Sequence, residues 1–137
     1  MNWLFKEEPG SYSFDDLITD GGTRWSGVRN PLAQIHLRAV RRGDRILYYH
    51  TGKEKAVIGT AAVVRGPHAD PEQDDPKLAV VDLKAGKALP APVTLAAVKA
   101  ERSFADFALV RMSRLSVMPV TAAQKRRLMS MARDNSR

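Results

Sequence analysis

The sequence predicts an α+β domain: a small mixed β-barrel of five or six strands, with short helices at its periphery and one helix at its C-terminal end. Strand-like stretches are short, and helical stretches of uneven length separate them, which differs from the regular alternation of a doubly wound sheet. The 137 residues contain no linker, internal repeat or low-complexity segment, so we expect one domain over residues 1–137. A hydrophobic content of 44% is enough for one core.

The first third of the chain predicts one strand and two helices. Residues 2–6 alternate as a strand. A short helix follows its N-cap, Ser13, and extends to about Ile18. The second helix has Asn30 as N-cap and Pro31 at its first position, and it reaches about residue 40. Its core-facing positions are expected to be Leu32, Ile35, Ala39 and Val40.

The middle of the chain predicts three strands, at residues 45–50, 56–64 and 77–83, with Gly59 marking a bulge in the second. Residues 67–76 contain three prolines and four acidic residues, so we expect an exposed loop in which the acidic run 70–75 is solvated.

The last third predicts short helices, one extended segment and a final helix. Residues 90–92, Pro-Ala-Pro, lead into a short helix that Thr94 caps and that ends near residue 100. A helical turn at 103–107 follows, and residues 109–118 hold an extended segment around 115–117. Pro119, Val120 and Thr121 then start the final helix, in which Thr121 and Gln124 fit a capping box and which extends to about Arg133.

Composition and charge limit the classes of function that the chain can have. The 22 Lys and Arg residues exceed the 15 Asp and Glu residues, giving a net charge of +7. Such a charge attracts polyanions, most often nucleic acid, although a basic surface without a ligand is the alternative. No apolar run approaches the ~20 residues that span a bilayer, and the N-terminus does not resemble a signal peptide. Cysteine is absent, so disulfides and thiolate sites are excluded. We expect a cytoplasmic protein without membrane contact.

The segment from Trp25 to Asn30, Trp-Ser-Gly-Val-Arg-Asn, combines groups that suit a nucleotide. An indole can stack on a base, Arg29 can bind phosphate, and a helix begins directly after the segment. Each residue also has a simpler interpretation, with Trp25 as a core residue and Asn30 as an N-cap.

The strand end at residues 48–50 supplies a second set of candidates. Alternation places Tyr48 and His50 on one face and Tyr49 on the other, so only one set can line a pocket. His50 could instead be a hydrogen-bonded strand-end residue. No histidines have the spacing of zinc ligands, and no phosphate-binding loop or nucleophile motif is present. We therefore expect no metal, no cofactor and no catalytic group.

Several separated motifs together resemble the EVE domain, a family of the PUA-like superfamily. They are Trp3 to Pro9, Tyr12 to Leu17, Trp25 to Asn30, Gly43-Asp44, Tyr49 to Thr51 and Arg114 to Thr121. The resemblance runs in the family's order from Trp3 to about Leu128. It implies a PUA-like mixed β-pseudobarrel with a pocket related to that of YTH domains, which bind a modified base in an aromatic cage. It further implies a non-enzymatic module that binds DNA or RNA carrying a methylated or hydroxymethylated base.

The resemblance also implies the residues of the pocket. They are Trp3, Lys6, Trp25, Ser26, Gly27, Val28, Arg29, Asn30, Tyr49, His50, Thr51, Arg114 and Ser116. Trp25 would stack on the base, Asn30 and the backbone of 26–30 would contact its edge, and Lys6, Arg29 and Arg114 would hold phosphate or a polar substituent. After Asn30 the family pattern is close to Tyr-Gln-Ala-Arg-Asn, whereas this chain has Pro31, Leu32, Ala33, Gln34 and Ile35. Base preference and backbone contacts are therefore expected to differ.

Two other functions remain open. A small enzyme is possible because PUA-like ASCH proteins include hydrolases and nucleases, and its titratable group would be His50 or Lys6. An accessory module could instead bind tRNA or rRNA by shape. The oligomeric state is left open by the sequence, with a monomer favoured.

Overall fold

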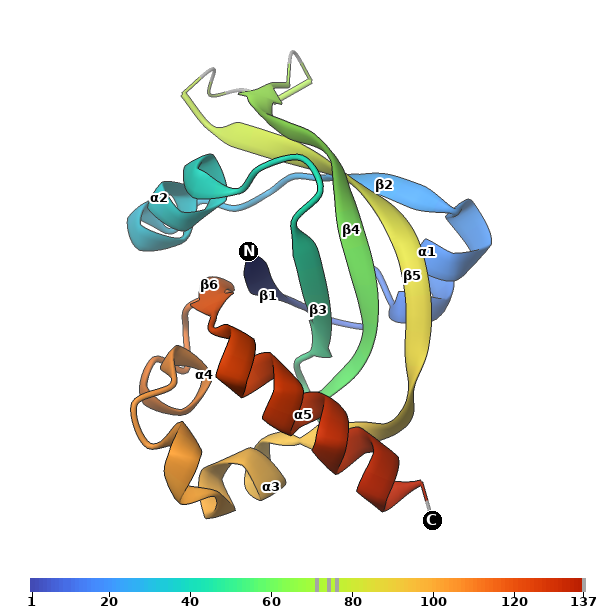
Figure 1. Cartoon of the computed structure of the whole chain (residues 1–137). Coiled ribbons are helices and arrows are strands. Elements are labelled where there is room, and N and C mark those ends of the chain that lie inside the picture. The colour runs from blue at the N-terminus through green and yellow to red at the C-terminus, as the bar shows by residue number, and fades with distance from the viewer. Residues whose placement is uncertain (71, 74, 76, 137) are drawn as a thin grey trace.

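The computed structural model describes residues 1–70, 72–73, 75 and 77–136, which contain one six-stranded sheet (Figure 1). Its strands, in chain order, are β1 (Asn2–Glu7), β2 (Gly22–Trp25), β3 (Arg45–His50), β4 (Ala56–Ala69), β5 (Ala79–Thr94) and β6 (Val117–Val120). Across the sheet the order is β2-β5-β4-β3-β1-β6. Only β1 and β3 pair in parallel, and the other pairs of the described strands are antiparallel. The predicted mixed sheet is confirmed.

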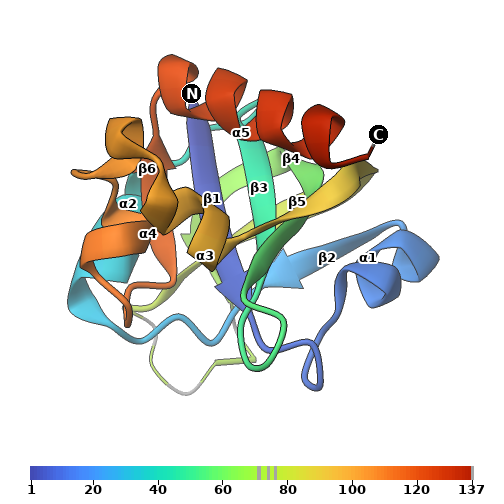
Figure 2. The ribbon, with the colours of Figure 1, turned by 90° about the horizontal axis from the view of Figure 1, so that it is seen from below.

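Short helices surround this sheet, as predicted. They are α1 (Phe14–Asp20), α2 (Pro31–Ala39), α3 (Leu95–Ala100), the 3₁₀ turn η1 (Arg102–Phe104), α4 (Ala108–Arg111) and the longer C-terminal α5 (Ala122–Asn135). Figure 2 shows α5 lying across one end of the sheet, with α1 beside β2 on another side. The α+β class is therefore confirmed, with the C-terminal helix in its expected place.

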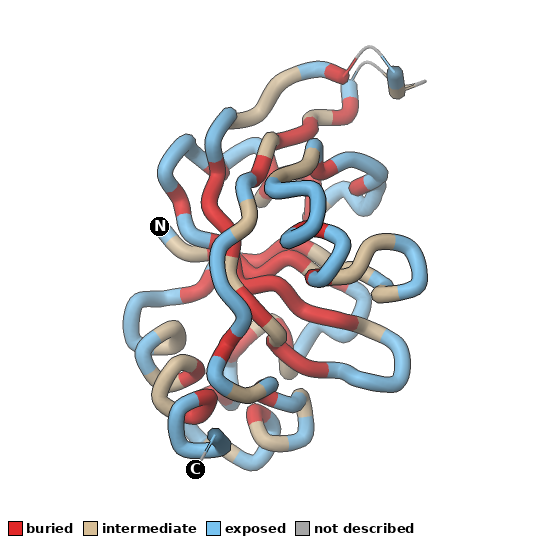
Figure 3. The backbone as a smooth tube through the Cα atoms, turned by 90° about the vertical axis from the view of Figure 1, so that its right-hand side faces the viewer, coloured by how far each residue is buried: buried red, intermediate tan, exposed pale blue. Residues whose placement is uncertain are grey.

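The sheet curls around its core, as contacts between distant strands show. The rings of Trp25 on β2 and Phe5 on β1 have centroids 5.4 Å apart, although three strands separate β2 from β1 in the sheet. Trp25 also meets Tyr48 of β3 edge to face at 5.5 Å. Side chains this close across a sheet require strong curvature, which is the geometry of a partial barrel. Buried positions follow the strands, whereas exposed positions concentrate in the connections (Figure 3).

Four predicted helix caps are confirmed. Side-chain oxygens of the N-cap residues accept from backbone N–H groups three residues further along. The caps are Ser13 to Asp16, Asn30 to Ala33, Thr94 to Ala97 and Thr121 to Gln124. Ser13 and Thr121 complete capping boxes with the side chains of Asp16 and Gln124. These local patterns determine where the helices begin.

The predicted core face of α2 was right in part: Val40 is buried and Leu32 packs against the core, whereas Ile35 and Ala39 are exposed. Ile35 is 60% exposed, and the residues of α2 that are buried are Ala33, Gln34 and Leu37. Gln34 can be buried because its amide is fully hydrogen-bonded to backbone of two other segments. The tertiary hydrogen bonds of Gln34 thus help to determine which face of α2 is buried, and this face differs from the one that hydropathy predicts.

Strands β4 and β5 are longer than predicted. Residues 67–69, expected in a loop, continue β4, and Asp70 is buried beside Arg24 at 3.2 Å rather than solvated. Residues 71, 74 and 76 of the predicted loop lie outside the described residues. Pro90 and Pro92 lie in β5, which continues to Thr94, the cap of the predicted short helix. The register of the β4–β5 ladder shifts between the pairs Gly59–Ala88 and Val57–Val93, and both prolines lie between these pairs.

Three further elements differ from the sequence prediction. Strand β2 has only four residues, too few for an alternation pattern, and pairing with β5 defines it. Helix α4 replaces part of the extended segment. Pro119, expected to open the last helix, lies within β6, where an edge strand tolerates a residue that cannot donate.

Candidate nucleic-acid interface

Three segments that are distant in sequence meet at Lys6, at the end of β1. The backbone N–H of Lys6 donates to the carbonyl of Ser116 at 2.9 Å, and its Nζ donates to the carbonyl of Ser113 at 3.1 Å. The same Nζ lies 5.5 Å from the ring centroid of Tyr49 on β3. The fold thus brings together the ends of β1 and β3 and the segment 111–116.

Lys6 is a half-buried cation at this junction. Burial lowers its pKa below the ordinary value for lysine. The carbonyl of Ser113 and the face of Tyr49 both stabilise the ammonium form. Tyr49 is itself buried, and burial raises the pKa of its hydroxyl. Tyr49 therefore supports the ammonium group of Lys6 and is not an open aromatic wall.

The loop 26–30 is a further component of the candidate interface, and buried contacts hold it in place. Gly27 has φ of 78°, a left-handed conformation that favours glycine, and Val28 is buried. Gln34 of α2 donates to the carbonyl of Val28 at 2.6 Å. Ser26, Arg29 and Asn30 remain exposed. Buried Val28 thus fixes the loop, and the polar side chains on either side of it face solvent.

The side-chain oxygen of Asn30 accepts a hydrogen bond within the protein, whereas its NH₂ group is available to a ligand. Its Oδ1 accepts from the backbone N–H of Ala33 at 3.0 Å, which fixes the side chain at the start of α2. Its amide NH₂ makes no hydrogen bond within the described part of the chain. The N-cap interpretation of Asn30 is confirmed, and two donors remain for a ligand.

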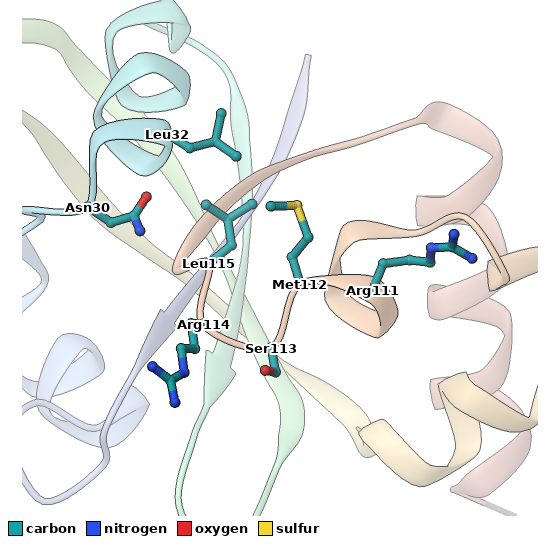
Figure 4. Close-up of a pocket in the computed structure, with 7 residues that line it drawn as sticks. All are labelled: Asn30, Leu32, Arg111, Met112, Ser113, Arg114 and Leu115. Carbon is teal, nitrogen blue, oxygen red and sulfur yellow. The ribbon is translucent and has the colours of Figure 1, made fainter.

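A cavity of about 340 Å³ opens next to Asn30. Its lining residues are Asn30, Leu32, Arg111, Met112, Ser113, Arg114 and Leu115. Figure 4 shows Leu32, Met112 and Leu115 directed toward one another, whereas the guanidinium groups of Arg111 and Arg114 extend outward. The cavity therefore combines an apolar interior, an amide and a cationic rim. Its volume lies in the range typical of small-ligand sites.

Trp25 lines a second, smaller cavity on another side of the loop. This cavity measures about 220 Å³, and its lining residues are Glu7, Tyr12, Thr23, Arg24, Trp25 and Ser26. Trp25 is only 5% exposed and packs against Phe5 and Tyr48. Its packing role in the core is thus visible, and stacking on a base stays a prediction.

His50 is committed to structural hydrogen bonds. The backbone N–H of Phe14 donates to its Nε2 at 2.9 Å, so the ring proton resides on Nδ1, which lies 2.6 Å from Oε1 of Glu54. Both ring nitrogens are therefore occupied, which leaves neither available for proton transfer to a substrate. Thr51 follows at the strand end, where its backbone N–H donates to the carbonyl of Glu7 at 2.9 Å.

Trp3 lies deeper in the fold than the other predicted site residues. It is 2% exposed, and its indole N–H donates to Asp44 at 2.8 Å. Its ring lies 6.2 Å from that of His36 on α2. The structure thus brings together Lys6, Asn30, Tyr49, Arg114 and Ser116, and it places Trp3 within the core.

Several residues of this interface were missed by the sequence prediction. They are Glu7, Arg24, Leu32, Arg111, Met112, Ser113, Leu115 and Gln34. For Gln34 a signal exists, because residues 30, 33, 34 and 37 share one helical face. For residues 111–113, which precede the motif that begins at Arg114, no local signal exists, since their place in the cavity depends on the packing of α2 beside β6.

The described residues contain neither a group of metal ligands nor a membrane-spanning helix. Among residues 1–70, 72–73, 75 and 77–136, no three His, Cys, Asp or Glu side chains are grouped as metal ligands would be. None of the helices described is long and apolar enough to cross a bilayer. The predicted cytoplasmic location stays a prediction.

Comparison with known proteins gives one family and several similar structures. The model of the EVE domain family matches residues 1–131. The human protein "Thymocyte nuclear protein 1" is 29% identical over 154 aligned residues, which cover 88% of this chain and 68% of that protein.

Two solved structures share the fold. The NMR structure of Rpa0253 from Rhodopseudomonas palustris is 47% identical with a TM-score of 0.90, covering 96% of this chain and 92% of that one. The crystal structure of human THYN1 protein in complex with 5-methylcytosine containing DNA is 25% identical with a TM-score of 0.86. The matched regions cover 96% of each of these two chains.

Proposed function

The chain belongs to the EVE domain family, and from this premise we propose that it binds nucleic acid and accepts one modified base beside loop 26–30. The observation that carries the proposal is the exposed amide of Asn30, held by its helix cap at the mouth of the 340 Å³ cavity. The human relative in complex with 5-methylcytosine containing DNA supports the ligand class. No catalytic step is part of the proposal.

The larger cavity suits a base that carries a methyl group. Leu32, Met112 and Leu115 offer apolar contacts of the kind that proteins make with the methyl group of thymine. Burying one methyl group contributes about 0.8 kcal/mol, which corresponds to about a fourfold preference over the unmodified base. A hydroxymethyl group should gain less, because its hydroxyl loses water on entering an apolar cavity.

Polar groups around the cavity would hold the rest of the nucleotide. The NH₂ of Asn30 can donate to acceptors on the base edge. Arg29, next to Asn30 in the loop, and Arg114, which lines the cavity, are exposed cations suited to the flanking phosphates. Taking a base out of a duplex costs a few kcal/mol, which these contacts must offset, so a single strand should bind more readily.

Fluorescence anisotropy with labelled oligonucleotides tests this function. DNA and RNA strands of one sequence would carry a central unmodified, methylated or hydroxymethylated base. We expect at least one methylated strand to bind about fourfold more tightly than its unmodified control. Equal affinity for every modified strand and its control would refute the proposal.

Variants of Asn30 separate base recognition from folding. Asn30→Ser keeps an N-cap of similar strength but removes the amide donors. We expect unchanged thermal stability and weaker binding of both strands, because the amide of Asn30 contacts the base edge whether or not the base carries a methyl group. Arg114→Gln should weaken both strands equally. Arg102→Gln is the matched control, an exposed arginine on η1 outside both cavities.

A further inference from the structure

A second concave surface lies along α5, and none of its residues belongs to either cavity described above. Two cavities, of about 400 and 510 Å³, share Met129 of α5. The smaller one lies between α5 and the beginning of β1, and the larger one lies between α5 and the β4–β5 pair. We call this surface the α5 groove.

The pairing register of the sheet builds one side of the α5 groove. Asn2 pairs with Arg45, Arg45 pairs with Ala62, and Ala62 pairs with Lys84. Paired residues on neighbouring strands point to the same face, so these side chains form one row across four strands. Neighbouring strands lie about 4.8 Å apart, which places Arg45 and Lys84, two strands apart, roughly 10 Å from each other.

The helix builds the other side. The α5 residues that line the groove recur at intervals of three and four, the spacing of one helical face. They are Ala122, Lys125, Arg126, Met129 and Arg133. Lys125 and Arg133 are eight residues apart, or about 12 Å along the helix axis. Basic side chains therefore extend along the groove as well as across it.

The charge of the α5 groove has one sign. Its six cations are Arg45, Lys84, Lys87, Lys125, Arg126 and Arg133. None of the lining residues is acidic. Within the described part of the chain, none of the six cations belongs to an ion pair. By contrast Arg127, on the same helix, pairs with Glu101 at 3.1 Å.

We propose that the α5 groove binds the phosphodiester backbone of the same nucleic acid whose base enters the cavity beside Asn30. Six unpaired cations spread over roughly 10 by 12 Å fit a row of phosphates, which recur about every 3.4 Å per strand, rather than one small anion. This inference rests on the proposed function for the choice of partner. The groove supplies affinity without sequence preference, and the Asn30 cavity supplies the preference for a base.

The test compares two triple variants of the full chain. Lys84→Gln/Lys87→Gln/Arg126→Gln removes three groove charges, all on exposed side chains. Lys53→Gln/Lys99→Gln/Arg102→Gln removes three exposed charges elsewhere and is the matched control. Binding of an unmodified 20-base-pair DNA duplex is measured by anisotropy over a range of salt concentrations. Thermal unfolding of both variants checks that they fold.

We expect the groove variant to lose at least tenfold in affinity at about 0.1 M salt and the salt slope to fall by about 0.9 per lost phosphate contact. The ratio of affinities for modified and unmodified strands should not change. Equal losses in both variants, or no loss in the groove variant, would overturn the proposal. So would tighter binding of a polyglutamate chain of equal charge, which would assign the groove to acidic peptides.

The two proposals fail in different ways. If the protein has no preference for a modified base, the Asn30 cavity is not a base site, yet the groove variant can still lose duplex binding. If the preference exists and the groove variant keeps full affinity, only the groove proposal is wrong.

Discussion

Replacing Gln34 by leucine should destabilise the protein, although hydropathy alone favours the change. Gln34 is 3% exposed and lies on the buried face of α2. Its Nε2 donates to the carbonyls of Val28 at 2.6 Å and Ala79 at 3.2 Å, and its Oε1 accepts from the N–H of Ala79 at 3.0 Å. One side chain thus connects α2, loop 26–30 and β5. Leucine would fill a similar volume and make none of these bonds.

The size of the effect follows from these three bonds. The carbonyl of Val28 would be left buried without this partner, which costs about 1–3 kcal/mol. The two partly buried bonds to Ala79 contribute about 0.5–1.5 kcal/mol each. The apolar surface of leucine offsets about 1–2 kcal/mol of this loss. Taking the middle of each range, the net loss is about 2.5 kcal/mol, or about 9 °C in Tm at about 2.1 cal/mol/K of unfolding entropy per residue.

The assay is urea unfolding and calorimetry of Gln34→Leu beside Ile35→Gln. The second variant makes the reverse change one residue further along, at a side chain that is 60% exposed, and should shift stability by less than about 0.5 kcal/mol. If Gln34→Leu is as stable as the wild type, or if Ile35→Gln is the more damaging change, the orientation of α2 described here is wrong.

Two further changes test other parts of the fold. A Cβ at Gly59 would lie 2.3 Å from Cζ of Phe14, so Gly59→Ala should destabilise the fold by about 1–3 kcal/mol through overpacking. Adding Phe14→Leu should remove most of that loss of stability. If urea unfolding shows that the effects of the two substitutions are strictly additive, this contact is contradicted. Burial raises the pKa of Asp44, but hydrogen bonds from the Trp3 indole and the Arg41 backbone, together with the nearby α-amino group, outweigh burial and hold that pKa below its usual value. A lowered pKa in the folded state stabilises the fold above the unfolded pKa and loses this effect as the pH falls through the folded value. The stability difference between wild type and Asp44→Asn should therefore be largest near neutral pH and shrink below about pH 3.9, and a difference independent of pH would exclude this role.

The beginnings of the helices could be predicted because their signals are local. Ser13, Asn30, Thr94 and Thr121 each satisfy a donor three residues away, and this pattern is visible in the sequence. The face that each helix buries is not local in this sense. For α2 it depends on Gln34 reaching the backbone of Ala79, forty-five residues further along.

The prolines at 90 and 92 illustrate the same limit. The predicted helix follows them and is capped by Thr94, but the prolines themselves lie in β5, between the pairs Ala88–Gly59 and Val93–Val57. The register of β4 and β5 shifts between these two pairs. The length of β5 therefore depends on pairing with β4, which the local sequence does not show.

The candidate interface divides in a similar way. Its family motifs could be read from the sequence, and Asn30 and Arg114 line one cavity with Lys6 beside them. The sequence did not reveal which motif residues the fold buries, and burial decides whether a side chain can contact a ligand. Trp3 lies in the core, and His50 has both ring nitrogens engaged.

The sequence by itself determined the α+β class, the helix caps, the EVE family and the excess of positive charge, because each depends on residue identity or on contacts within four residues. The tertiary structure alone decided where that charge gathers. Arg45, Lys84 and Lys125 come from separate elements, and only the strand register and the packing of α5 make them one surface. The same applies to the cavity beside Asn30, whose opposite side comes from residues more than eighty positions away. Long-range pairing is collective, so no single stretch of sequence encodes it.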